Sequence, residues 1–141
     1  RSVLKNKIIN KKLQKELLKP TKIYTKEIMK IYNLNLINSA AHITGGGLID
    51  NISRSIPNNL SINVDLSKIK IKPIFKWLKK NKISDNEMLK TFNCGVGFCI
   101  ITNIKNVNKI QKYFNKEYKP YVIGRVTNNN KRVYLSNNLI W

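Results

Sequence analysis

Three consecutive glycines, Gly45, Gly46 and Gly47, follow a short apolar run and precede a helical pattern. Each glycine costs backbone entropy and adds no side chain to pack, so something must require the bare backbone there. The first turn of a helix carries unpaired N–H groups and the positive end of the dipole, which bind anions. The stretch matches neither the dinucleotide fingerprint nor the Walker loop. A phosphate-binding turn and a merely tight turn are therefore both open.

Polar residues stand close to these glycines in the sequence. His42 and Thr44 lie two residues apart on a predicted strand, so their side chains share one face of it. His42 is the only histidine of the chain, and a lone histidine is more often structural than catalytic. Asn93 and Gly95 mark a second glycine-containing entry into a strand, which is equally typical of a bulge or a close backbone approach. One histidine and no activated serine motif exclude a Ser-His-Asp triad.

Composition narrows the classes of partner. The 141 residues are 42% hydrophobic, enough for the core of one domain over 1–141. The net charge of +20 by itself suggests nucleic acid, an anionic membrane or an anionic substrate. The cations are nearly all lysines, spread along the chain, whereas base-reading and bidentate phosphate sites favour arginine. A compositional bias toward Lys, Asn and Ile explains the charge better than selection for nucleic acid.

The few acidic residues and the two cysteines do not predict a further catalytic or metal site. Asp50 and Asp65 stand out among the few acidic residues, and helix capping or surface solubility is their simplest interpretation. Cys94 and Cys99 form neither a disulfide framework nor a zinc pattern, which predicts reduced thiols in a cytosolic protein and no metal site. No apolar run approaches the length of a membrane span, so no membrane partner is expected.

Helices and strands must position the candidate site residues. Apolar residues at helical spacing predict helices over 2–18, 22–34, 48–56, 73–81, 84–92 and 106–118. Ser84 with Glu87 forms a capping box, and Pro73 suits a first helical turn. Apolar or alternating runs predict strands over 40–44, 61–67, 94–102, 121–127 and 131–136, the last two joined as a hairpin by the turn at 128–130. This order predicts an α+β fold, a mixed β-sheet packed with helices.

Several segments in order carry a family resemblance. They are LLKPTKIYTKEIMKI (17–31), AHITGGGLIDNI (41–52), VDLSKIKIKPIFKWL (64–78), MLKTFNCGVGF (88–98) and YVIGRV (121–126). Together they resemble the C-terminal domain of the phosphoribosylformylglycinamidine cyclo-ligase (aminoimidazole ribonucleotide synthetase) family, over nearly the whole chain. The resemblance implies that family's cytoplasmic reaction in de novo purine (IMP) biosynthesis. The enzyme uses ATP to convert formylglycinamidine ribonucleotide to aminoimidazole ribonucleotide, ADP and phosphate.

The same resemblance implies roles for the residues singled out above. Gly45, Gly46 and Gly47 would offer backbone amides to a phosphate or to developing charge in a cleft between two domains. His42 and Thr44 would be aimed at that cleft as catalytic residues. With them, Asn93 and Gly95 are expected to bind phosphate or substrate.

The resemblance covers only part of the family enzyme. The N-terminal domain, expected to hold most of the ATP and Mg²⁺ site and much of a homodimer contact, is absent from these 141 residues. The chain is therefore expected to be inactive alone. Two alternatives stay open: a basic nucleic-acid-binding module, motivated only by the charge and lacking a recognisable motif, and an inactive remnant of the enzyme.

Overall fold

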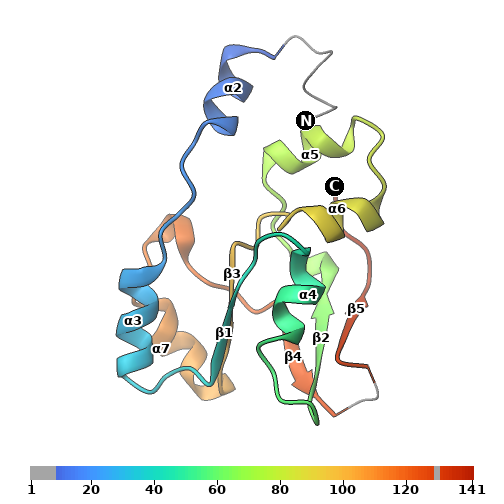
Figure 1. Ribbon diagram of the computed structural model, residues 1–141. Helices are drawn as coiled ribbons and strands as arrows, with labels where there is room; N and C mark the ends of the chain where they lie inside the picture. Colours follow the sequence, from blue (N-terminus) through green and yellow to red (C-terminus); the bar gives the residue numbers. More distant parts are fainter. Residues whose placement is uncertain (1–8, 129–130) are drawn as a thin grey trace.

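The computed structural model describes residues 9–128 and 131–141. Helices and strands are interspersed along this part of the chain (Figure 1). The α-helices are α2 (Lys11–Leu17), α3 (Thr25–Asn33), α4 (Gly47–Ser53), α5 (Pro73–Lys79), α6 (Asp85–Thr91) and α7 (Val107–Gln111). The strands are β1 (Ser39–His42), β2 (Ser61–Asp65), β3 (Phe98–Ile101), β4 (Gly124–Thr127) and β5 (Val133–Ser136). Short 3₁₀ helices lie at Leu66–Lys68 (η1), Ile104–Asn106 (η2) and Lys116–Tyr118 (η3).

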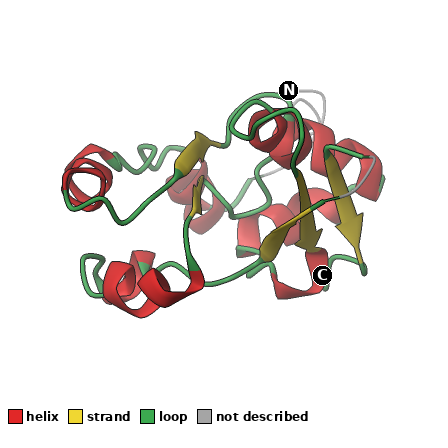
Figure 2. Cartoon of the chain, turned by 90° about the horizontal axis from the view of Figure 1, so that it is seen from below, coloured by secondary structure: helices red, strands yellow, loops and turns green. Residues whose placement is uncertain are grey.

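The described strands form two sheets. β1 pairs with β3 in antiparallel orientation, so that His42 lies opposite Phe98. In the second sheet β2 is central, with β4 antiparallel on one side and β5 parallel on the other. Figure 2 shows this three-stranded sheet apart from the β1–β3 pair. The predicted α+β class with helices packed on sheets is confirmed, with two small sheets in place of a single one.

The predicted hairpin of 121–127 with 131–136 is wrong. β4 and β5 do not pair with each other, because both pair with β2. β2 is the natural central strand, since Ile62 and Val64 are buried and both of its edges find hydrogen-bonding partners. A turn signal reports only on neighbouring residues, so it cannot reveal a third strand that arrives from far back in the sequence.

The five strands are all shorter than predicted. The largest differences are at the starts of β3 and β4, which begin at Phe98 and Gly124. Cys94 and Gly95 have φ angles of 50° and 105°, which an extended strand does not allow. They form a turn in which the Val96 N–H donates to the carbonyl of Asn93 (2.8 Å).

The predicted helix starts at Ser84 and Pro73 are confirmed, whereas some of the predicted helices are longer than the helices of the structure. The Ser84 hydroxyl accepts a hydrogen bond from the Glu87 N–H (3.2 Å), and Pro73 begins α5. Asp65 caps η1, as its capping interpretation predicted, by accepting from the Ser67 N–H (3.1 Å). The helices predicted over 2–18 and 106–118 are longer than α2 and α7, and residues 2–8 lie outside the described part.

Two cores position the site. The larger one lies around α4, α6, β1 and β2, and its fully buried side chains include Ile43, Leu48 and Met88. The smaller one, of Ile31, Leu36 and Ile110, joins α3 to α7, which lie side by side in Figure 1. β3 contributes to both, because Cys99 and Ile101 pack on the larger core and Ile100 on the smaller. None of the helices in the described part is long and apolar enough to cross a membrane.

Candidate functional site

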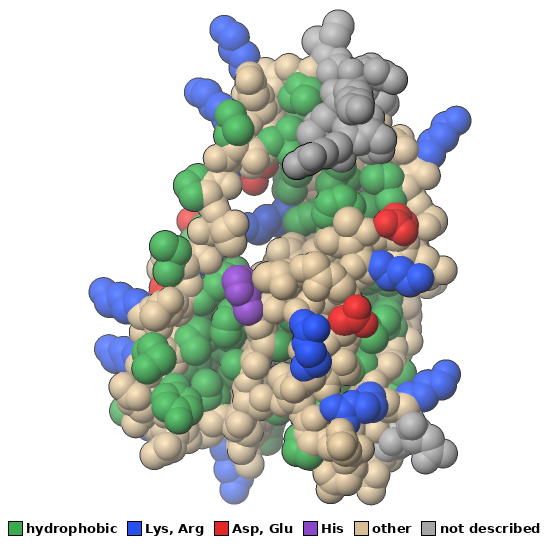
Figure 3. All heavy atoms as spheres, viewed as in Figure 1, with side chains coloured by type: hydrophobic (Ala, Val, Ile, Leu, Met, Phe, Trp, Pro, Cys, Tyr) green, Lys and Arg blue, Asp and Glu red, His purple; other side chains and the backbone are tan. Residues whose placement is uncertain are grey.

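His42 is the last residue of β1 and is exposed at the surface. Its ring stacks on Phe98, its partner across the sheet, at 5.8 Å between centroids, and Tyr24 meets it edge-on at 6.0 Å. Figure 3 shows the histidine at the edge of an area of apolar side chains. Burial is the main cause that raises the pKa of Tyr24. The imidazole is therefore held by ring contacts on one side and open to a ligand on the other.

A pocket of about 460 Å³ lies beside His42. Its wall combines the rings of Tyr24, His42 and Phe98 with Ile28 and Met29 of α3 and the residues that precede this helix. A mostly apolar wall with a few polar groups is typical of pockets that bind organic ligands or another protein surface.

Thr44 and Asn93 lie together at a second pocket. This cavity of about 280 Å³ is also lined by Ile43, Phe75 and Phe92. The structure thus joins two predicted site residues from separate segments. Thr44 lies beyond the end of β1, yet burial still alternates there, with Ile43 buried and Thr44 exposed. His42 and Thr44 share the outer face, as predicted, but they line different pockets.

The glycine turn has a structural cause at two of its three positions. Gly46 precedes α4 with φ of 90°, and Gly47 begins the helix with φ of 63°; both values favour glycine. A Cβ on Gly47 would lie 1.8 Å from the Leu89 carbonyl oxygen, so α4 and α6 can approach only at a glycine. Gly45 has neither constraint, because its φ is ordinary and, in the part of the chain that the structure describes, nothing lies within 4 Å of a Cβ placed there. The chain itself does not explain why residue 45 is glycine.

The structure reveals two residues at the turn that the sequence reasoning missed. The Asn51 amide nitrogen donates to the carbonyls of Gly45 (3.1 Å) and Gly47 (2.7 Å). Arg54 donates to the Asn51 amide oxygen (2.6 Å). The available signal was weak: an asparagine on the buried side of a predicted helix, four residues after the last glycine.

The turn also carries a negative charge. Asp50 lies in the first turn of α4, and its carboxylate is within 2.8 Å of a Cβ built on Gly46. Asp50 does not cap the helix, because Gly46 is the N-cap residue and no side chain caps α4; its carboxylate only places negative charge near the positive end of the helix. A phosphate at Gly46 would therefore meet this carboxylate as well as the backbone amides.

Gly95 has a structural explanation that does not involve a ligand. Its N–H donates to the Asn93 side-chain oxygen (3.0 Å), and its φ is 105°. A Cβ there would lie 2.9 Å from the Lys70 carbonyl oxygen. Asn93 lines the smaller pocket, whereas Gly95 serves the turn and a close backbone approach.

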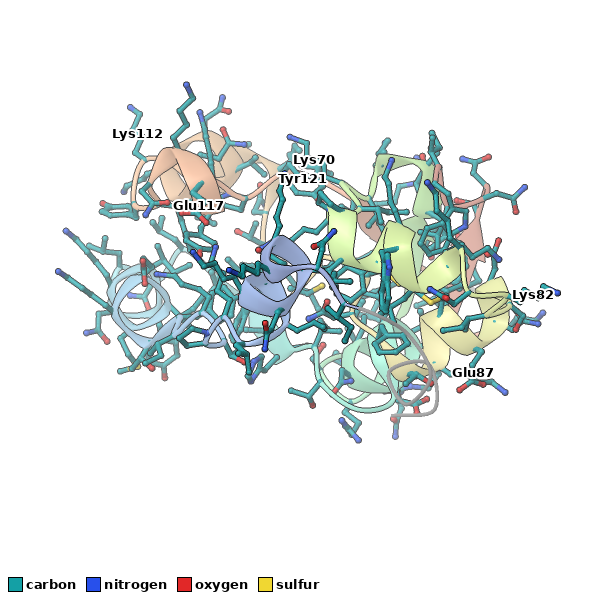
Figure 4. The ribbon with its side chains drawn as sticks, turned by 90° about the horizontal axis from the view of Figure 1, so that it is seen from above. Lys70, Lys82, Glu87, Lys112, Glu117 and Tyr121 are labelled. Carbon is teal, nitrogen blue, oxygen red and sulfur yellow. The ribbon has the colours of Figure 1, made fainter. Side chains whose placement is uncertain are left out.

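Neither the Lys70 ammonium nor the Cys94 thiol is activated for chemistry. Figure 4 shows Lys70 beside Tyr121; the ammonium lies 4.6 Å from the ring centroid, and the Lys70 N–H donates to the Tyr121 hydroxyl (3.0 Å). Burial and the nearby Asp85 carboxylate raise the pKa of the Cys94 thiol to about 11. Within residues 9–128 and 131–141, no group of three His, Cys, Asp or Glu side chains is placed to hold a metal ion.

Comparison with known proteins identifies similar sequences. The family model "AIR synthase related protein, C-terminal domain" matches residues 2–136. The phosphoribosylformylglycinamidine cyclo-ligase of Streptococcus pneumoniae serotype 4 is 39% identical over 117 residues, which are 82% of this chain and 34% of that protein. The trifunctional purine biosynthetic protein adenosine-3 of Chironomus tentans is 47% identical over 98 residues, 69% of this chain and 7% of that protein. The chain thus spans a third or less of the length of these curated relatives.

Proposed function

The chain belongs to the family of AIR synthase related C-terminal domains, and from this premise we propose that it is the C-terminal part of a phosphoribosylformylglycinamidine cyclo-ligase. The proposed reaction converts formylglycinamidine ribonucleotide and ATP to aminoimidazole ribonucleotide, ADP and phosphate. Support comes from the family match over 2–136 and from the cyclo-ligase at 39% identity. We further propose that residues 1–141 act as one domain, and that the complete enzyme is a cytoplasmic homodimer.

Gly45 is the observation that carries the site proposal. No contact with residues 9–128 or 131–141 requires a glycine at this position, whereas Gly46 and Gly47 are needed for the backbone path. A bare backbone that the fold does not need is the feature expected where a ligand approaches closely. The sequence neighbour of Gly45, Thr44, lines the same pocket as Asn93.

The proposed reaction requires groups that stabilise negative charge on oxygen. Transfer of a phosphoryl group to the formyl oxygen, ring closure by an amidine nitrogen and loss of phosphate all place negative charge on oxygen. In this proposal the amides of the glycine turn donate to that charge, and the Thr44 hydroxyl adds a donor. His42, whose ring is held by Phe98 and Tyr24, faces the bound nucleotide as a donor or acceptor.

The described residues do not fit a magnesium site by themselves. The described residues provide no set of three ligating side chains, and only Asp50 brings a carboxylate to the turn. We therefore derive no step through a metal on this chain. Most ligands for ATP and Mg²⁺ are proposed to come from the part of the enzyme that this chain does not match.

The test is reconstitution in a mixture. The chain is added to a separately produced N-terminal part of a cyclo-ligase, and ADP formation is followed with and without formylglycinamidine ribonucleotide. Activity that requires both polypeptides and falls in the His42→Ala and Gly45→Ala variants supports the proposal. Ile104→Ala, at an exposed residue of η2, serves as the control and keeps wild-type activity. A folded wild-type mixture without activity contradicts the proposal and leaves an inactive remnant.

A further inference from the structure

Gly97, immediately before β3, is a glycine whose backbone conformation does not require one. Its φ lies outside the left-handed region, unlike those of Gly46, Gly47 and Gly95. Its carbonyl accepts a hydrogen bond from the Ile43 N–H (3.0 Å), so it continues the pairing of β1 with β3. A glycine weakens a strand and often marks a close approach of another group. The reason for this glycine therefore lies in what occupies the space of its missing side chain.

The hydroxyl of Tyr24 fills that space. A Cβ built on Gly97 would overlap the hydroxyl oxygen and lie 3.2 Å from Cζ of the same ring, and the three nearest atoms all belong to Tyr24. A Cβ on Gly47 or Gly95 would instead meet a backbone carbonyl first. The absence of a side chain at Gly97 thus lets the tip of Tyr24 rest on the backbone beside the sheet.

The backbone that carries Tyr24 is fixed as well. Tyr24 is the residue before α3, and its carbonyl accepts a hydrogen bond from the Ile28 N–H (3.0 Å). Lys22 and Glu27, which flank it in the sequence, form an ion pair at 2.9 Å, with side chains only 22% and 18% exposed. This ion pair spans Tyr24 and holds the start of the helix. Both ends of the Tyr24 side chain are therefore held in place.

The ring of Tyr24 completes a set of three rings in mutual contact. Its centroid lies 5.2 Å from that of Phe98 and 6.0 Å from that of His42, and the centroids of His42 and Phe98 are 5.8 Å apart. All three separations lie in the range that aromatic pairs prefer. The three rings line the same pocket of about 460 Å³. A displacement of Tyr24 would therefore remove one of the two ring contacts that hold the imidazole.

We propose that Tyr24 is a positioning residue: its hydroxyl rests on Gly97, and its ring sets the direction in which His42 faces the pocket. The inference rests on the proposed function, in which His42 faces the bound nucleotide. Tyr24 acts through the imidazole, Gly97 acts through Tyr24, and neither touches a reacting atom in this scheme. The direction matters because a group misplaced by about 1 Å can lose much of its contribution to the rate.

The test uses two substitutions that compensate each other. Gly97→Ala places a methyl group where the Tyr24 hydroxyl lies, and the ring should swing away, because the tip of a side chain moves more easily than the backbone. Tyr24→Phe removes the hydroxyl and keeps the ring. In the double variant the methyl group occupies the space that the hydroxyl has left, and Cζ at 3.2 Å is then the nearest ring atom, so the ring can return after a small shift. Tyr32→Phe, at an exposed tyrosine of α3, is the matched control.

NMR of the 141-residue chain gives the first readout. His42 is the only histidine, ring currents shift its carbon-bound protons, and nuclear Overhauser effects report its contact with the ring at position 24. We expect Gly97→Ala to lose these Overhauser effects and to shift the imidazole resonances, and the double variant to restore both. Tyr24→Phe and Tyr32→Phe should keep them. Unchanged imidazole resonances in Gly97→Ala overturn the proposal, and so does a double variant that restores nothing.

The rescue separates positioning from general stability. A variant that is merely destabilised is not repaired by the loss of a second group, whereas a displaced ring is. If Gly97→Ala does not fold, Tyr24→Ala removes the ring without adding an atom beside the sheet and should also shift the imidazole resonances. Imidazole resonances at their wild-type positions in Tyr24→Ala overturn the proposal.

Activity gives a second readout. In an active reconstituted mixture, Gly97→Ala should lower kcat by about tenfold with a smaller change in KM, because the imidazole is misdirected. The double variant should return kcat to within about threefold of the Tyr24→Phe value, since the two changes compensate each other. Wild-type kcat in Gly97→Ala overturns the inference. An inactive wild-type mixture instead contradicts the proposed function, while the imidazole resonances still decide whether Tyr24 positions His42.

Discussion

Gly45, Gly46 and Gly47 are adjacent in the sequence, but their surroundings differ. Gly47 is pressed against the Leu89 carbonyl, and Gly46 has the left-handed φ of 90° that begins the helix, whereas Gly45 is open. The three glycines therefore have different reasons. Packing requires glycine at Gly47, the backbone conformation favours it at Gly46, and the fold places no constraint on Gly45. The three positions can be separated by substitution.

Gly47→Ala should destabilise the chain strongly. Its new Cβ would meet a backbone oxygen at 1.8 Å, and its φ of 63° is unfavourable for alanine. We expect a loss of about 2–4 kcal/mol in the free energy of unfolding, measured by urea denaturation. Gly45→Ala should change that free energy by less than about 0.5 kcal/mol, yet lower the activity of the reconstituted enzyme. Equal destabilisation by both variants would contradict this division of roles.

The Cys94 thiol should be unreactive in the native chain. Burial raises its pKa from 9.0 to about 11, so its thiolate fraction near pH 8 falls about 100-fold. Alkylation by iodoacetamide, followed by mass spectrometry, should be slower by at least that factor than in urea. The protonated thiol contributes stability below about pH 9, and this contribution is lost as the pH rises to about 11. Equal alkylation rates of native and unfolded chains would contradict the assignment.

At the scale of elements, α4 is held at both ends. Asn51 ties its start to the glycine turn, and Arg132, just before β5, ties its end. The Arg132 guanidinium donates to the carbonyls of Ser53 and Ile56 and to the side chain of Asn58. The helix that carries the turn is thus fixed to the three-stranded sheet.

Arg132→Ala should loosen the end of α4 and expose its carbonyls. Hydrogen bonds from a charged donor contribute about 1.5–3 kcal/mol each, and water replaces part of this, so we expect a loss of about 2 kcal/mol. Thermal and urea unfolding measure it. Arg125→Ala, at an exposed position of β4, is the matched control and should stay within about 0.5 kcal/mol of wild type. A similar effect of both variants would show that charge, not the ties to α4, matters.

Elements that depend on nearby residues could be predicted from the sequence. The cap at Ser84, the start of α5 at Pro73 and the glycine turn ahead of α4 all follow from short-range chemistry. Two predictions failed for different reasons. β2, which comes from far back in the sequence, separates β4 from β5, whereas β3 is shortened by a local turn at Cys94 and Gly95 that lies within an apolar run. At the site, Thr44 and the glycines were predicted as site residues from their types, whereas the hydrogen bonds of Asn51 to the glycine turn are visible only in the folded chain.

At the scale of the whole molecule, charge is poorly balanced. The chain carries 27 Lys and Arg against 7 Asp and Glu, and lysines in the described part often pack on tyrosine rings, such as Lys22 and Lys72 on Tyr118. Like charges spread over one small surface repel each other and oppose the compact state. This repulsion is a property of the chain as a whole and not of any one lysine.

Salt should therefore stabilise the molecule. Raising NaCl from about 20 mM to about 500 mM shortens the screening length severalfold, and we expect the free energy of unfolding to rise by about 1–2 kcal/mol. Urea unfolding at each salt concentration measures this. Binding to nonspecific duplex DNA should weaken steeply over the same range, as for any polycation. Binding that persists at high salt with a preference for one sequence would favour the nucleic-acid-binding alternative over the enzyme.

The order β4–β2–β5 also governs how the chain is made. When β2 leaves the ribosome it has two unpaired edges, and both of its partners follow much later in the sequence. At about 5–20 residues per second, the stretch from Leu66 to Ser136, the end of β5, takes about 4–14 s to add. During that interval the bare edges of β2 can pair with another nascent chain. A premature stop before Gly124 should therefore yield insoluble protein rather than a smaller stable domain.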